Sequence, residues 1–151
     1  MTSVLSKEML ANIGRKEAPR REFVSRREIR KYAIATRQRQ EKYLSGEEAP
    51  PIFHFVLFWD VVELDQLHAD GCSTDKLLPE FPLKREMAGG LNIEYFKPIR
   101  AGDELVATRT LTDIYEKMGS KGPLIFYVIV MEVVDSFGEP VLTQTTTRIL
   151  R

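Results

Sequence analysis

The chain has 151 residues, of which 43% are hydrophobic and 29% charged, with 22 basic residues against 22 acidic ones. This length and composition indicate one compact domain with a hydrophobic core and exclude a disordered or fibrous chain. The longest apolar run, Phe55–Trp59 with its neighbours, is far too short to cross a bilayer, and the first residues lack the charged-then-apolar order of a signal peptide. We therefore expect a cytoplasmic protein with no membrane segment.

Side chains that bind metals or form disulfides are scarce. Cys72 is the single cysteine, and His54 and His68 are the two histidines. The sequence therefore predicts no internal disulfide, no metal site and no cofactor.

The charges are spread unevenly along the chain. Residues 1–42 hold 12 basic and 5 acidic residues, which leaves 10 basic and 17 acidic ones for the remainder. A basic surface of this kind can attract phosphates or an acidic protein, or can be an ordinary solvated helix face. Nucleic acid is not an expected partner, because the basic residues lack interleaved aromatic side chains and the total charge is zero.

The first part of the chain predicts short helices. Residues 1–19 form an N-terminal extension in which 3–12 could be a short helix, and a short strand is expected at 21–24. Ser25 and Glu28 have capping-box spacing, so a helix should begin there. Its apolar stripe continues, with breaks, until Ser45 and Gly46 supply a stop.

Residues 52–59 are the most hydrophobic part of the chain and follow two prolines. Proline is tolerated in the first turn of a helix, so this segment could be a helix that is buried on every side. A buried strand would give the same pattern, and periodicity does not separate the two. The polar residues 65–88, which are interrupted by two prolines and one glycine, predict a loop.

The last part of the chain alternates predicted strands with turns. The strands are expected at 91–96, 104–117, 123–135 and 141–150, joined as an antiparallel meander. Residues 124–134 are apolar at both alternating sets of positions, so a helix inside and a partner or second layer outside should cover that strand. A capped helix, a buried helix and a long meander predict an α+β hot-dog fold, with the sheet wrapped around a central helix, as a single domain over residues 1–151.

Residues 89–103 resemble the strand and turn of the MaoC-like (R)-specific enoyl-thioester hydratases and dehydratases. They carry an aromatic residue, a basic residue with proline, and a final Gly-Asp. Further segments resemble the FAS1-like, N-terminal-type subgroup of that family, namely 23–36, 110–117, 122–126 and 135–139. The resemblance covers about residues 20–151 and implies an acyl-CoA thioester as substrate.

The same resemblance implies that the catalytic residues are missing. In active members an Asp and a His after the first helix move a water across the enoyl thioester, and these positions fall on Gln38 and Tyr43. An amide is no base, and a phenol with an ordinary pKa of about 10 stays protonated at neutral pH. The family's oxyanion donor, a backbone N–H, falls on residues 49–51, where two prolines have none. We therefore expect a non-catalytic half that pairs with an active MaoC-like subunit.

In such a pair the non-catalytic half would line the acyl tunnel. The residues on the central segment that could contact the acyl chain, or could simply pack in the core, are His54, Phe55, Phe58 and Trp59. Two basic residues in the later turn, Lys97 and Arg100, could contact the pantetheine or phosphates of coenzyme A, or could be solvated.

Two other functions remain compatible with the sequence. A hot-dog thioesterase could use Asp60 or Glu63 to activate water or to attack the thioester. An acyl-CoA-binding homo-oligomer would need no catalytic residue. A homodimer, a heterodimer and a higher assembly all stay open, as does the acyl group, which could be fatty, aromatic, a steroid side chain or dicarboxylic.

Overall fold

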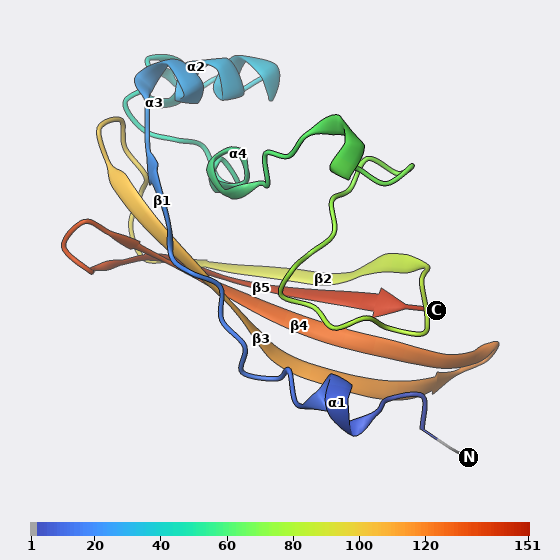
Figure 1. Ribbon diagram of the computed structural model, residues 1–151. Helices are drawn as coiled ribbons and strands as arrows, with labels where there is room; N and C mark the ends of the chain where they lie inside the picture. Colours follow the sequence, from blue (N-terminus) through green and yellow to red (C-terminus); the bar gives the residue numbers. More distant parts are fainter. Residues whose placement is uncertain (1–2) are drawn as a thin grey trace.

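The computed structural model describes residues 3–151 and contains one curved, five-stranded antiparallel sheet (Figure 1). The strands are β1 (Arg20–Phe23), β2 (Glu86–Tyr95), β3 (Glu104–Gly119), β4 (Gly122–Asp135) and β5 (Pro140–Leu150). The helices are α1 (Lys7–Leu10), α2 (Arg26–Ala35), α3 (Glu41–Leu44), α4 (His54–Phe58) and the 3-10 turn η1 (Leu64–Gln66). The α+β class agrees with the prediction. None of these helices is long and apolar enough to cross a membrane.

The strand order β1-β3-β4-β5-β2 differs from the simple meander that the sequence predicted. Only β3, β4 and β5 follow one another as neighbours, whereas β2 pairs with β5 at the far edge. The connection over residues 96–103 crosses the end of the sheet and buries Ile99 in the core. Three interstrand spacings amount to about 14 Å, which this segment can span. The prediction was wrong because strand alternation does not specify the neighbour.

Two predicted helices are shorter than expected. Within residues 3–12 only α1 is helical. The helix α2 begins as predicted, because the Ser25 hydroxyl accepts from the Glu28 N–H at 3.1 Å. It ends at Ala35, since Arg37 takes a left-handed conformation with φ of 55° that interrupts the helix. The later part of the predicted apolar stripe therefore forms α3 separately.

The predicted loop 65–88 is shorter than expected, because β2 begins at Glu86. Pairing with β5 accounts for the early start, and a bulge accommodates the glycines. A Cβ on Gly89 would lie 2.9 Å from an Ile149 side-chain atom, so a side chain would not fit there. The remaining loop lies over the concave face of the sheet (Figure 1) and inserts Leu77 and Phe81 into the core.

The core occupies one face of the sheet. The buried residues of β4 alternate along the strand and are Ile125, Tyr127, Ile129, Met131 and Val133. The alternate residues Phe126, Val128 and Val130 are only half-buried on the convex face. Residues 3–151 therefore supply one covering layer, and the expected second layer is not part of them.

Within the segment 52–59, residues His54–Phe58 form the helix α4, and this segment is not buried on every side. Its inner residues are fully or almost fully buried, whereas Ile52, Val56 and Trp59 are 41%, 45% and 59% exposed. We call these three residues the apolar stripe of α4. The helix starts late because Ile52 has a φ of 72°, which is incompatible with a right-handed helix.

Candidate functional site

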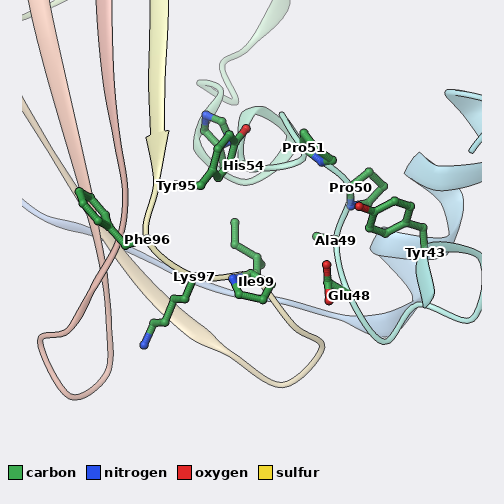
Figure 2. Close-up of a pocket in the computed structure, with 11 residues that line it drawn as sticks. Tyr43, Glu48, Ala49, Pro50, Pro51, His54, Tyr95, Phe96, Lys97 and Ile99 are labelled. Carbon is green, nitrogen blue, oxygen red and sulfur yellow. The ribbon is translucent and has the colours of Figure 1, made fainter. Parts of the chain in front are cut away.

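Two cavities meet at His54. The smaller, which we call the mouth cavity, has a volume of about 320 Å³ and lies between the segment before α4 and the end of β2 (Figure 2). Its lining residues are Tyr43, Glu48, Ala49, Pro50, Pro51, His54, Tyr95, Phe96, Lys97, Pro98 and Ile99. The larger, which we call the long cleft, has a volume of about 1160 Å³ and is lined by α4, the loop after it and the concave face of the sheet.

His54 is fully buried and has one unsatisfied nitrogen. Its Nε2 lies 2.7 Å from Oε1 of Gln144, whose amide nitrogen donates to Thr146 at 3.2 Å. Because an amide oxygen can only accept, Nε2 carries the proton and Nδ1 is the free acceptor. Burial lowers the pKa of His54, and the bond to Gln144 offsets part of that shift, so the imidazole is neutral at pH 7. His54 therefore presents a buried acceptor between the two cavities.

Acidification is expected to destabilise the fold through His54. Since its pKa is lowered in the folded state, the unfolded chain takes up a proton that the folded chain does not. The stability that neutral His54 provides is complete above the unfolded pKa of about 6.5 and is lost as pH falls toward the lowered folded value. One such proton gives a slope of at most about 1.4 kcal/mol per pH unit. Urea unfolding between about pH 7.5 and about pH 5 measures it.

The matched controls for this slope are two glutamine variants. His54→Gln should flatten the slope, whereas His68→Gln, at an exposed histidine, should leave it unchanged. Equal slopes in both variants would show that another group causes the pH dependence.

Gln38 and Tyr43, the positions onto which the family's catalytic dyad falls, do not lie in one site. Tyr43 is 9% exposed and lines the mouth cavity, with the Lys42 ammonium 4.9 Å above its ring. Gln38 lines neither cavity and donates to the Thr36 hydroxyl at 3.3 Å. The left-handed turn at Arg37 directs the chain away from the mouth cavity, and the chain returns to it at α3.

The segment 49–53 offers no free backbone N–H to the mouth cavity. Its two prolines have none. The N–H groups of Ala49 and Phe53 donate to backbone carbonyls, and that of Ile52 donates to the Tyr95 hydroxyl at 2.9 Å. Tyr95 lies beside His54 in Figure 2. A thioester oxygen in this cavity would therefore find no donor from this segment.

The aromatic candidates on and after α4 line the long cleft together with His54. Phe58 is also part of the core, Phe55 is half-buried, and Trp59 lies with its ring centroid 6.4 Å from that of Phe55. Their position is compatible with both roles that the sequence left open.

The two basic candidates are placed differently. Lys97 lines the mouth cavity and forms an ion pair with Asp135. Arg100 is exposed, lines neither cavity and lies 3.8 Å from the Glu48 carboxylate. Lys97 can therefore meet a ligand at the mouth, whereas Arg100 stays outside it.

The two acidic candidates also separate. Asp60 lines the long cleft, but Arg20 binds its carboxylate at 2.7 Å. Glu63 is exposed and lines neither cavity. Of the two, Asp60 alone is placed to reach a bound ligand.

Several cleft residues were missed because they come from distant strands. Arg109 on β3 pairs with Glu17 at 2.8 Å and with Asp75, and Tyr127 on β4 donates to Glu86 at 2.7 Å. Burial raises the pKa of Tyr127, so it stays a donor. The residues Gln144, Thr146 and Arg148 of β5 also line the cleft. Residues 144–148 are polar at every position, so the sequence carries no signal as to which of them face the cleft. No cluster of three metal-ligating side chains occurs within residues 3–151.

Comparison with known proteins gives one family match. A family model described as "FAS1-like, dehydratase domain region" matches residues 11–144. None of the curated protein sequences is significantly similar.

Three solved structures illustrate the fold. A chain of the ChsH1-ChsH2 complex from Mycobacterium tuberculosis is similar with a TM-score of 0.70 and 16% identity, covering 95% of this chain and 86% of that one. The C-terminally truncated HadBC (3R-hydroxyacyl-ACP dehydratase) complex from the same organism gives 0.62 and 18%, covering 91% and 96%. The MaoC-like dehydratase from Rhodospirillum rubrum gives 0.60 and 18%, covering 97% and 96%. The predicted hot-dog fold is confirmed.

Proposed function

Because the chain belongs to the FAS1-like dehydratase family of MaoC-like hot-dog proteins, we propose that it is the non-catalytic subunit of an enoyl-thioester hydratase or dehydratase. The subunit shapes the acyl pocket for an acyl-CoA thioester beside a partner that carries the catalytic Asp and His. It uses no cofactor and acts in the cytoplasm.

One observation carries the proposal: the mouth cavity is formed, but it lacks the complete set of groups that hydration needs. Hydration needs two groups that move protons and a donor for the thioester oxygen. At the cavity, Lys42 binds the Glu48 carboxylate at 2.8 Å. Gln144 binds the protonated nitrogen of His54, so within the described residues the His54 Nδ1 is the one acceptor of these groups that stays free. Of the family's two dyad positions, Tyr43 places a phenol in the cavity, whereas the Gln38 amide lies outside it. These residues can enclose a thioester but do not supply the complete set of groups.

The uncovered apolar surface supports a partner subunit. The apolar stripe of α4 adjoins Tyr95, which is 44% exposed on the edge strand β2, through the hydrogen bond from Ile52. Leu91, on the same strand and at the rim of the long cleft, is 50% exposed. A subunit that joined the β2 edge would cover these side chains and close the cleft. The similar HadBC and ChsH1-ChsH2 structures are complexes, which favours a heteromeric partner over a homodimer.

The test compares the chain alone with the chain co-expressed with a subunit that has the intact Asp and His loop. Hydration of crotonyl-CoA and of bulkier enoyl-CoA thioesters is followed by loss of enoyl absorbance. We expect the complex to be at least about a hundredfold more active, the scale of general acid–base catalysis. A partner variant without its Asp and His is the control.

Two outcomes contradict the proposal. Comparable activity of the chain alone would show that this chain carries the catalytic residues, and Glu48 and His54 would be the first candidates. A complex that assembles and binds acyl-CoA but hydrates none of the thioesters would exclude the hydratase function.

A thioesterase is the second candidate because Asp60 lines the long cleft. Thiol release from acyl-CoA that is lost in Asp60→Asn and retained in Glu63→Gln would support it. If the chain binds acyl-CoA but releases no thiol, an acyl-CoA-binding oligomer without catalysis would be the remaining function.

A further inference from the structure

The floor of the long cleft has an apolar half and a polar half. The sheet register places Met131 beside Gln144, Ile129 beside Thr146, and Tyr127 beside Arg148, and all six residues line the cleft. The β4 half is therefore mainly apolar, whereas every cleft-facing residue of β5 from 144 to 148 is polar. A plain hydrocarbon chain would cover the polar half without giving it hydrogen-bond partners, which is unfavourable.

The polar half offers donors to a ligand. Gln144 is already used by His54 and Thr146. The Thr146 oxygen accepts from Gln144, so its own O–H is available. The Arg148 Nε lies 3.6 Å from Glu86, and within residues 3–151 the remaining guanidinium N–H groups form no hydrogen bond. A ligand that satisfies this side of the cleft must bring acceptor oxygens.

Length and width of the cleft limit the ligand further. Arg148 lies four positions after Gln144, which corresponds to about 13 Å along a strand. In the subunit alone, the open cleft has a volume of about 1160 Å³, which is above the usual range for small-molecule sites. A single extended chain would leave much of this space without contacts, so a broader group gains more dispersion energy.

We propose that the acyl group in this cleft is broad and carries an acceptor oxygen, a carbonyl or a carboxylate, that Arg148 binds about 13 Å from the His54 end. The inference rests on the proposed function, which puts the thioester at the mouth cavity and the acyl group in the long cleft. It narrows the acyl groups to ring-containing or branched ones with a distal oxygen and excludes an unsubstituted fatty chain as the preferred ligand.

The experiment measures binding of saturated acyl-CoA thioesters by calorimetry, in the complex and in the chain alone, so that it does not depend on hydration. The first pair is decanoyl-CoA and its counterpart with a carbonyl at the penultimate carbon. The second pair is a ring-containing acyl-CoA with and without a distal carbonyl. We expect the oxygen to tighten binding on the order of tenfold in each pair, the effect of a hydrogen bond to a charged donor, and each ring-containing ligand to bind more tightly than its straight-chain counterpart.

Matched variants isolate Arg148. Arg148→Met keeps the side-chain length and should remove the preference, whereas Lys84→Met, at an exposed cation of the same cleft, should retain it. Glu86→Gln removes the charge beside Arg148 but leaves an oxygen for Tyr127, so it should strengthen binding of a terminal carboxylate. Thermal melting verifies that each variant is folded.

Equal affinities within both pairs, or a preference that survives Arg148→Met, would overturn the inference while leaving the proposed function intact. Tighter binding of the straight-chain ligands would overturn the broad acyl group. A retained preference in a complex that does not hydrate would instead overturn the proposed function alone.

Discussion

Phe53→Ala is expected to lower the free energy of unfolding by about 4 kcal/mol. Phe53 is fully buried just before α4 and packs edge-on against Tyr32, with ring centroids 5.6 Å apart. It belongs to the core cluster that joins α2, α4 and the sheet. Removing the ring leaves a cavity in a close-packed region, and the loss is a large share of the roughly 5–15 kcal/mol that stabilises a typical domain.

Urea unfolding followed by circular dichroism measures this loss. Phe137→Ala is the matched control, because that ring is 88% exposed in the turn between β4 and β5. Its expected effect is within about 0.5 kcal/mol. Similar losses in the two variants would show that Phe53 does not anchor α4 to the core.

Thr146→Trp is expected to weaken binding of long, broad acyl-CoA thioesters by about tenfold, because the indole takes up volume that such an acyl group would fill. Thr146 lies on the floor of the long cleft, midway between Gln144 and Arg148. An indole there would occupy the path of a long acyl group. Butyryl-CoA, whose short chain stays near the mouth, should bind as before.

The control is the same substitution one residue earlier. Successive strand residues point to opposite faces, so Thr145→Trp puts the indole on the convex face, opposite Val130. Calorimetry with long and short saturated thioesters should show no selective loss for this variant. If both variants lose long-chain binding equally, the long cleft is not where the acyl group lies.

Local features of the fold could be predicted from the sequence, because they depend on neighbouring residues. Ser25 and Glu28 mark the start of α2, and the runs of strand-forming residues between turns mark β3, β4 and β5. The pairing of β2 with β5 could not be predicted in this way. Both strands have patterns that fit several neighbours, and the choice depends on how the 96–103 connection packs over the end of the sheet.

The residues of the candidate site also differ in whether they could be predicted from neighbouring residues alone. His54, Phe55, Phe58 and Trp59 were predicted as a group because they lie within one short helical segment. Residues such as Arg109 and Arg148 reach the cleft only through strand pairing, so no local pattern places them beside α4. The burial of Tyr43 at the mouth and the exclusion of Gln38 depend on one left-handed residue, Arg37, for which the sequence carries no glycine signal.

The pairing of β2 with β5 also determines when the molecule can finish folding. The register joins Glu86 to Leu150 and Tyr95 to Leu142, so β2 leaves the ribosome well before its partner strand exists. The hairpins β3–β4 and β4–β5 have local contacts and can form first, whereas closing the long loop to β2 is slower. Until then β2 and the open edge of β5 can pair with other chains, which makes early aggregation a hazard during synthesis. Since Ala88 and Leu91 of β2 line the long cleft, we expect the binding site to be completed only after β5 has been made and has paired with β2.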